Sequence, residues 1–484
     1  MRATMRPDGI VVEPEKRLPI ASSEDVIVAG GGSAGIMAAI AAARNGARTL
    51  LVEQAGFLGG ATTAAMMAQI SAGAPGITGL GRELVDRLKG MGGVEGEFLI
   101  PIDPEAFKLA SVEMLHEAGA RQLAYSFVAG IIRDGDHVKG LIVENKSGRQ
   151  AILGKVVIDA TGDADVCAMA GAEVVMGREN DHKMRPISMI FQMANVDIRR
   201  MVDFARVHPE DFAPDPGYHV LDPDGGLVRL VGYFSQVEEA KRKGELFSDC
   251  YYIRLEGIIV ERGTVLVNAT RIYNVDGTNA ADLTRADLES RRQSFQVAEF
   301  LCNYAPGFEN AFLSQTAAYV GVRETRHIVG DHLLTDEDIL GDRDFPDTVV
   351  RSYKRQQPGT QSHSPDGREG APDDPSARSV VAPVLGFNIP YRAMTPAGLD
   401  GLLVAGRCIS QNHVSDGFTR LQPTAWAMGQ AVGTIAALAV KKGVSARQMA
   451  KHIPEVRNTL VSQGMGLTDE DFGEIPRYRK RAFA

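Results

Sequence analysis

The first regular pattern along the chain is an apolar run that ends in glycines and is followed by small residues. Residues 25–53 contain the segments DVIVAG, SAGIMAAIAAARNG and ARTLLVEQ in that order. A short apolar run bounded by a turn is typical of a buried strand, and a longer small-residue stretch is typical of a buried helix. Gly46 stands where such a helix would end in a left-handed residue. The pattern predicts a strand, a turn, a helix and a second strand.

The same criteria predict further elements between residues 79 and 172: helices 79–90 and 103–118, strands 120–128, 129–133 and 137–144, and another strand–turn–helix unit at 155–172. Asp103 is expected to cap the second helix, with Pro104 in its first turn. The Asp134-Gly135 pair favours a hairpin turn between the last two strands.

The pattern of apolar and polar residues changes at about residue 181. From there to 385 the segments are more polar and include two long loops, 208–227 and 352–380, and loops of this length are usually flexible or functional. The small-residue pattern then returns in GLLVAGRCIS and PTAWAMGQAVGTIAALAV. We therefore expect a nucleotide-binding layer that is split in the sequence, with these boundaries: an N-terminal extension 1–23, a first part 24–180, an inserted domain 181–385, a second part 386–445 and a C-terminal tail 446–484.

Three glycines between the first strand and the first helix fit a dinucleotide-binding turn. Gly30 permits the tight turn, Gly32 lets backbone amides approach a pyrophosphate, and Gly35 lets the helix lie close to the strand. The phosphate charge would then lie at the helix N-terminus. Glu53 ends the next strand, where its carboxylate can accept both hydroxyl groups of a ribose. The alternatives are a glycine turn that serves packing alone and, for Glu53, a solvated charge.

Composition and charge exclude several classes of protein. The net charge is −9 and the chain has no long basic run, which argues against a DNA or RNA partner. The four cysteines lack a CxxC pair and the ten histidines lack metal-ligand spacing, so no metal site and no redox dithiol are expected. The N-terminus has no apolar export segment and no apolar stretch reaches membrane-spanning length. We expect a cytoplasmic protein without a membrane partner, and its oligomeric state is left open.

Four sequence blocks resemble, in order, the FAD-dependent oxidoreductases of the glutathione-reductase structural type, in the branch near the fumarate-reductase-like flavoproteins. The blocks are DVIVAGGGSAGIMAAIAAARNGARTLLVEQAGFLGGAT, VVIDATGDADV, GVRETRHIVGDHLLT and LLVAGRCIS…GFTRLQPTAWAMGQAVGTIAALA. The resemblance implies an α/β fold with a three-layer, Rossmann-like FAD-binding domain, split in sequence, and an inserted α+β substrate or cap domain. The FAD is expected to be non-covalent, because the glycine loop 56–63 offers no His, Cys or Tyr.

The resemblance also implies which residues hold the cofactor. The pyrophosphate would lie on Gly30, Gly32, Ser33, Ala34 and Gly35, the adenosine ribose on Glu53 and Gln54, and the adenine on the backbone of Val128. A second turn near the adenosine half would be formed by Ala160, Thr161 and Gly162. The ribityl chain and flavin edge would pass Gly59, Gly60, Ala61 and Thr62. Gln422, Pro423 and Thr424 would aim helix amides at the flavin N1/C2=O locus, where a reduced flavin gathers negative charge.

One position departs from the pattern of the wider family. The late strand ends in Gly406-Arg407, where many relatives have Gly-Asp bonding the ribityl chain. The ribityl contact is therefore in question, and Arg407 could reach a phosphate instead.

Candidate catalytic residues occur in two segments. In 410-SQNHVSDGFTRLQP-423, His413 is the candidate acid or base and Arg420 the candidate clamp for a substrate carboxylate. The alternatives are a histidine bonded to backbone and an arginine that ties the loop. In 319-YVGVRETRHIVGDHLL-334, Arg323 and Arg326 could recognise a substrate anion. The alternative there is a buried network with Glu324 that holds the cap domain.

Flavin carries out redox chemistry itself, and the protein supplies orientation and charge. We expect a dehydrogenase or reductase that moves a hydride between a small organic substrate and flavin N5, with an unidentified electron acceptor. The alternatives are a flavin monooxygenase that uses NAD(P)H and O2, a flavoprotein subunit of a larger complex, and an FAD fold without redox activity.

Overall fold

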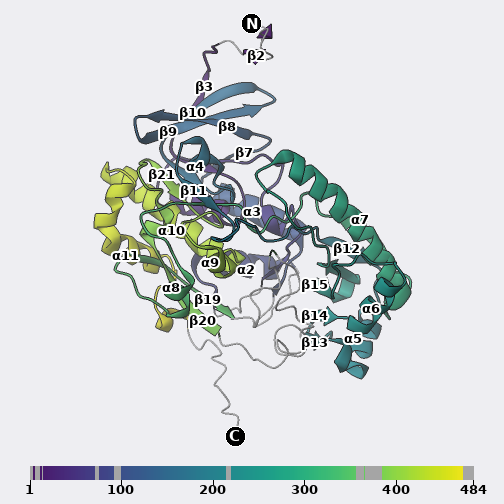
Figure 1. Cartoon of the computed structure of the whole chain (residues 1–484). Helices are drawn as coiled ribbons and strands as arrows, with labels where there is room; N and C mark the ends of the chain where they lie inside the picture. The colour runs from purple at the N-terminus through teal and green to yellow at the C-terminus, as the bar shows by residue number, and fades with distance from the viewer. Residues whose placement is uncertain are drawn as a thin grey trace.

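A computed structural model describes residues 4–5, 11–12, 15–70, 76–91, 100–213, 220–355, 365 and 384–472 of the chain. Two large sheets organise these residues (Figure 1). The first has the strand order β7 (Arg121–Leu123), β4 (Thr49–Val52), β3 (Ile20–Ala29), β10 (Gly148–Asp159), β9 (His137–Asn145) and β8 (Phe127–Asp134). β21 (Leu402–Val404) also pairs with β10.

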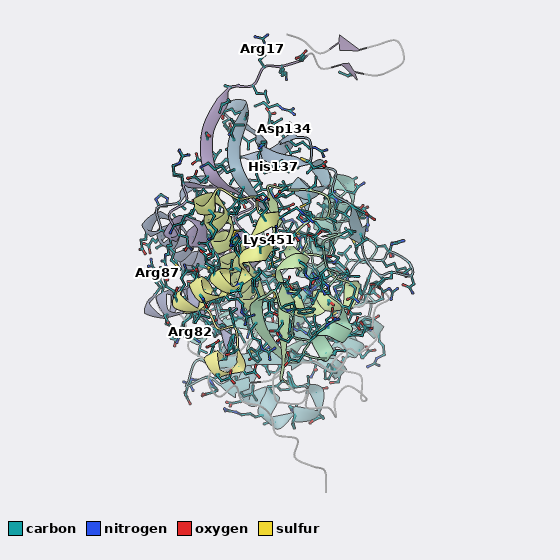
Figure 2. The ribbon with its side chains drawn as sticks, turned by 90° about the vertical axis from the view of Figure 1, so that its left-hand side faces the viewer. Arg17, Arg82, Arg87, Asp134, His137 and Lys451 are labelled. Carbon is teal, nitrogen blue, oxygen red and sulfur yellow. The ribbon has the colours of Figure 1, made fainter. Side chains whose placement is uncertain are left out.

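The long strand β10 joins the two parts of the first sheet. Along residues 148–153 it pairs antiparallel with β9, and along 157–159 it pairs parallel with β21, while β3 runs parallel on its other side. β8 and β9 form the expected hairpin, in which Asp134 is paired with His137 at the turn (Figure 2). Since β21 comes from the end of the chain, the nucleotide-binding layer is split in the sequence as predicted.

Helices α1 (Ser33–Arg44) and α10 (Gln422–Lys442) pack against each other at backbone distance. A Cβ atom built on Gly429 would lie 2.1 Å from the carbonyl oxygen of Ala34, and one on Gly433 would lie 2.2 Å from that of Ala38. These two glycines stand four residues apart on one face of α10 and meet the alanine-rich face of α1. Small residues therefore determine how closely the early and late helices approach.

The second sheet belongs to the inserted region and is antiparallel. Its order is β13 (Val220–Asp222), β14 (Leu227–Gly232), β15 (Ile253–Ile259), β16 (Thr264–Val267), β12 (Phe191–Ala194) and β17 (Phe312–Thr316). On its outer side Figure 1 shows α5 (Ile198–Val207), α6 (Phe234–Arg242) and α7 (Ala280–Tyr304). A separate hydrophobic core lies between these helices and the sheet. The α/β fold class with an additional inserted domain is confirmed.

The other α-helices and strand pairs lie outside these two sheets. They are α2 (Gly79–Gly90), α3 (Pro104–Glu117), α4 (Asp165–Met169), α8 (Asp336–Leu340), α9 (His413–Thr419) and α11 (Ile453–Ser462), with the strand pairs β1 (Thr4–Met5)–β2 (Val11–Val12), β5 (Gln69–Ile70)–β6 (Ile100–Pro101), β11 (Val174–Met176)–β18 (Arg326–Ile328) and β19 (Thr348–Arg355)–β20 (Val384–Pro390). Figure 2 labels Arg87 of α2, whose guanidinium group pairs with Glu117 of α3 at 2.6 Å.

Three segments differ from the sequence expectation or extend it. The predicted strand 120–128 is interrupted, because Tyr125 has a left-handed φ of 54° and the chain turns between β7 and β8. Part of the predicted loop 208–227 forms β13 and the start of β14. Residues 446–472, placed in the tail by the sequence, contribute Met449, Val456 and Leu460 to the main core. The expected loop 352–380 and the basic end of the tail lie mostly outside the described residues.

Candidate functional site

The turn between β3 and α1 is shaped by three glycines with different surroundings. Gly30 has φ +97°, and a Cβ there would lie 2.6 Å from the carbonyl oxygen of Ala160. At Gly35, a Cβ would lie 1.8 Å from the carbonyl oxygen of Gly30. At Gly32 the nearest atom to a Cβ would be the Cα of Gly60, at 3.8 Å. Gly30 and Gly35 therefore serve the close packing of the turn, whereas Gly32 borders open space.

Glu53 closes this turn from the neighbouring strand. Its Oε2 accepts the backbone N–H of Gly31 at 2.6 Å, and its Oε1 accepts the N–H of Ala55 at 2.7 Å. Each carboxylate oxygen has a second lone-pair direction beyond these bonds. The side chain is thus held rigidly at the cavity wall and keeps acceptor capacity for ribose hydroxyl groups.

A cavity of about 1020 Å³ runs from this turn to the face of the second sheet. Most of the residues predicted to hold FAD line it, and so do two of the predicted catalytic arginines. These lining residues are Gly30, Gly32, Ser33, Ala34, Glu53, Gln54, Gly60, Ala61, Val128, Ala160, Thr161, Gly162, Gly406, Arg407, Gln422, Pro423, Arg323 and Arg420. One continuous space therefore collects residues from four distant parts of the sequence.

Other predicted cofactor residues do not line the cavity. Gly35 packs against Gly30, and Gly59, with φ +116°, supports the turn before Gly60. Thr62 is fully buried. Thr424 is buried and its hydroxyl lies 2.7 Å from that of Ser352. These residues shape the backbone that carries the lining residues.

The N-terminus of α10 faces the cavity. Leu421 occupies the cap position and contributes no side-chain hydrogen bond, and Pro423 stands in the first turn. Gln422 donates from Nε2 to the carbonyl oxygen of Met67. An uncapped helix N-terminus provides amide donors and the positive end of the helix dipole.

Each of the three side-chain nitrogens of Arg407 is bonded to a protein atom. Its Nε donates to the carbonyl oxygen of Gly162 at 2.7 Å, and its Nη2 forms an ion pair with Asp163 at 2.5 Å. A third bond, from Nη1, goes to the carbonyl oxygen of Val322. Arg407 thus links the end of β21 to the second glycine turn and to the inserted region, in place of the Gly-Asp contact of the wider family.

Arg420 and Arg323 contribute positive charge to the cavity. Arg420 lies 3.5 Å from Asp416, and burial, with Arg185 nearby, lowers the pKa of Arg420 to about 10 despite this carboxylate. Arg323 is 9% exposed and donates to the carbonyl oxygen of Pro186. Burial first, and then neighbouring arginines, lower the pKa of Arg323 well below its ordinary value.

His413 and Arg326 lie outside the lining of the cavity. The Nδ1 of His413 is 2.8 Å from Oε1 of Glu324, which is also 3.5 Å from Nε2 of His327. Burial raises the pKa of Glu324, but the two histidines and Arg185 outweigh it and lower that pKa to about 2. Arg326 forms an ion pair with Asp165 at 2.9 Å. Both predicted catalytic residues are thus parts of networks between the domains.

The sequence interpretation missed the wall that the second sheet contributes. Arg229 of β14 and Arg254 and Glu256 of β15 line the cavity, while Leu230 and Leu255 point to the separate core. The alternation of charged and apolar residues in LVRLVG and IRLEGII is typical of a strand with one polar face. That period-2 pattern, with arginine on the polar side, could have identified this wall.

The geometry of the turn fits FAD. A Cβ at Gly60, which has φ +51°, would lie 2.8 Å from the Cα of Gly32, so backbone meets backbone at this point of the cavity. α1 begins at Ser33 without a capping side chain, which leaves its first-turn amides available for a pyrophosphate. The second uncapped helix, α10, borders the same cavity at Gln422.

Comparison with known proteins supports this assignment. The chain matches the family model described as FAD dependent oxidoreductase over residues 25–460. Comparison with curated proteins gives no significant match. Within the described part of the chain, every helix is too short or too polar to cross a bilayer.

Several solved structures are similar to this chain at low identity. A geranylgeranyl bacteriochlorophyll reductase-like protein from Thermoplasma acidophilum shares 16% identity, with a TM-score of 0.43 over 91% of this chain and 83% of that one. A p-nitrophenol 4-monooxygenase from Pseudomonas putida shares 11%, with a TM-score of 0.46 over 91% and 86%. A myxobacterial chondrochloren halogenase shares 13%, with a TM-score of 0.44 over 91% and 82%. Because the family model spans most of the chain, the protein belongs to the FAD-dependent oxidoreductases, and its cofactor is FAD.

Proposed function

We propose that the protein is a dehydrogenase or reductase that transfers a hydride between a small organic substrate and N5 of non-covalently bound FAD. The observation that carries the proposal is the shared cavity. It is lined by the pyrophosphate turn at Gly32, by the N-terminus of α10 at Gln422 and by charged residues of the second sheet. A substrate held by the sheet would therefore lie in the same cavity as the cofactor, next to it.

The residues of the chain have separate tasks in this proposal. The amides at the start of α1 bind the pyrophosphate, and Glu53 accepts from the ribose. The amides at the start of α10 stabilise the negative charge that a reduced flavin gathers. Bound FAD supplies the two-electron chemistry at N5. Arg323 and Arg420 orient the substrate, because both line the cavity and carry charge.

His413 remains the candidate acid or base, although it lies beside Glu324 rather than in the cavity lining. A proton transfer through it would need a group between its ring and the substrate. The rate of anaerobic flavin reduction in His413 variants separates this role from a structural one.

Anaerobic titration of the yellow protein tests the proposed reaction. We expect a substrate of the right class to bleach the flavin absorbance in the absence of oxygen and NADPH. If NADPH bleaches the flavin only when a substrate is present, and oxygen then yields a hydroxylated product, the monooxygenase alternative holds instead. Turnover that requires a co-purifying partner would support the alternative of a subunit in a larger complex.

One finer assignment rests on the sequence blocks alone. We infer from VVIDATGDADV and GVRETRHIVGDHLLT that the chain is close to the fumarate-reductase-like branch of the glutathione-reductase structural type.

A further inference from the structure

Five arginines surround the end of the cavity that the second sheet forms. We call Arg229, Arg254, Arg271, Arg323 and Arg420 the arginine cluster. Four of them are less than one-tenth exposed, and all except Arg271 line the cavity. Arg271 is buried outside the cavity lining, and its Nη2 donates to the hydroxyl of Tyr252 at 3.1 Å. The guanidinium carbons of Arg254 and Arg271 lie 5.9 and 5.7 Å from the centre of the Tyr252 ring.

The carboxylates that the structure describes pair with only some members of the cluster. Glu256 lies 4.0 Å from Arg229, and Asp416 lies 3.5 Å from Arg420 but also pairs with Arg185 at 3.0 Å. Neither Arg271 nor Arg323 has a carboxylate oxygen within 4.0 Å among the residues that the structure describes. Burying Arg271 and Arg323 without a described counter-charge is costly, so these two arginines favour an anion from outside the chain.

The acidic residues elsewhere in the cavity lining already have partners within the protein. Asp163 pairs with Arg407, Asp165 with Arg326 and Asp287 with Arg291, while Glu53 accepts two backbone amides. They therefore do not neutralise the cluster.

Two neighbouring groups report a positive local field. Burial raises the pKa of Tyr252, yet Arg271, Arg254 and Arg323 outweigh it, so that this phenol titrates below its ordinary value. Burial lowers the pKa of Arg323, and Arg271, Arg420 and Arg254 lower it further. Both shifts have the sign expected where cations crowd together.

The cluster is next to the flavin-facing helix. Gly257, which follows Glu256 on β15, donates its N–H to the side chain of Gln69 at 3.0 Å. Two residues before Gln69, the carbonyl oxygen of Met67 accepts a hydrogen bond from Gln422 at the start of α10. The segment 67–69 thus joins the sheet wall to the start of α10. The pyrophosphate turn, by contrast, lies at the start of α1.

We propose that the arginine cluster binds an oxyanion group, a carboxylate or a phosphate, of the organic substrate and so holds that substrate at the α10 end of the cavity. Guanidinium groups match either oxyanion because their planar fork donates two parallel hydrogen bonds. The substrate class is therefore a small organic acid or phosphate ester rather than a neutral or cationic compound. This inference rests on the proposed function of the same cavity.

Titration of the FAD-loaded protein with matched probes tests the proposal through the flavin absorbance spectrum, without turnover. The probes are succinate, butyrate, glycerol 3-phosphate and neutral succinamide. We expect at least one anionic probe to perturb the spectrum, with a Kd at least about tenfold lower than that of succinamide. The Kd of this anionic probe should rise with the NaCl concentration, because salt screens the charges. The preference between succinate and glycerol 3-phosphate distinguishes the two oxyanions.

Substitutions identify the site. Arg323→Gln and Arg254→Gln should each raise the Kd of the anionic probe at least about tenfold, and Arg323→Lys should lose less, because it keeps the charge. Arg199→Gln is the matched control, since Arg199 is an exposed arginine on α5 of the same domain. Flavin content per chain, measured for every variant, shows whether the fold is intact, and Arg323→Lys covers the case in which a glutamine variant does not fold.

Three results would overturn the inference: equal binding of succinamide and the acids, no spectral response to any probe, or wild-type anion affinity in folded arginine variants. Loss of FAD from these variants with unchanged anion affinity would assign the cluster to the cofactor instead. The proposed function fails separately, if no compound reduces the flavin. Reduction by a neutral substrate with no anion binding would preserve the function and refute the cluster.

Discussion

Gly35 packs directly on the carbonyl oxygen of Gly30, so closely that a Cβ at position 35 would lie 1.8 Å from that oxygen. Gly32, between them in the sequence, has no atom nearer than 3.8 Å to such a Cβ. Its φ of −79° is also open to any residue. Glycines of one motif therefore have distinct physical functions: two maintain the strand–helix contact, and one leaves room in the cavity.

This contrast predicts opposite outcomes for substitutions three residues apart. Gly32→Val should fold normally but bind FAD at least about tenfold more weakly, because the side chain enters the space expected for the pyrophosphate. Gly35→Ala should destabilise the protein by about 3 kcal/mol, because the helix must move away from the strand. Flavin content per chain and urea unfolding separate the two. Yellow Gly32→Val protein with normal flavin content would count against the cofactor site.

Glu53 offers a test of the ribose contact. Glu53→Gln keeps the size of the side chain but replaces an acceptor with an amide group facing a backbone N–H, at Gly31 or Ala55. We expect FAD affinity to fall about tenfold, as for the loss of a hydrogen bond to a charged group. Fluorescence titration of the apoprotein with FAD measures it. Titration with FMN, which lacks the adenosine ribose, is the control, and an equal loss for FMN would contradict the assignment.

The glycine turn and its neighbouring glutamate could be predicted from the sequence because local backbone requirements determine them, and their roles in cofactor binding stay predictions. Gly30, with φ +97°, and the strand-ending Glu53 are fixed by the turn itself. The split layer was also predictable, since buried small-residue helices such as α10 keep their pattern wherever they occur in the chain.

The substrate part depended on contacts that sequence separation hides. His413 meets Glu324 across 89 residues, and the distance between their side chains, 2.8 Å, has no local signature. Arg229 and Arg254 come together only because β14 and β15 pair in one register. Patterns within each strand indicate a polar face, but they do not say which cavity that face borders.

The buried carboxylate of Glu324 predicts a pH-dependent contribution to stability. Its pKa is lowered from 4.5 to about 2 in the folded protein, so its stabilising effect is complete above pH 4.5 and is lost as the pH falls toward 2. Glu324→Gln should therefore lower the free energy of unfolding by about 3 kcal/mol at neutral pH, and the deficit should shrink below pH 4.5.

Urea unfolding of FAD-saturated wild type and Glu324→Gln across this pH range measures the effect. Glu337→Gln, on the short helix α8, is a suitable control because it removes a carboxylate from another element. A deficit that stays constant down to pH 3 would show that the loss comes from packing rather than from the charge of Glu324.

His413 gives the sharpest test of catalysis, because its observed contact allows two roles. If its imidazole exchanges a proton during substrate oxidation, His413→Ala should slow anaerobic flavin reduction by about 100-fold or more. If it only holds Glu324, the same substitution should lower stability and leave the reduction rate per bound flavin unchanged.

His413→Gln distinguishes these roles, since an amide can still donate a hydrogen bond to Glu324 but cannot exchange a proton at neutral pH. The exposed His116 on α3 provides the control variant, His116→Ala. A stable, yellow His413→Gln protein with slow, pH-independent flavin reduction would establish the acid–base role. Wild-type reduction rates in both His413 variants would exclude that role.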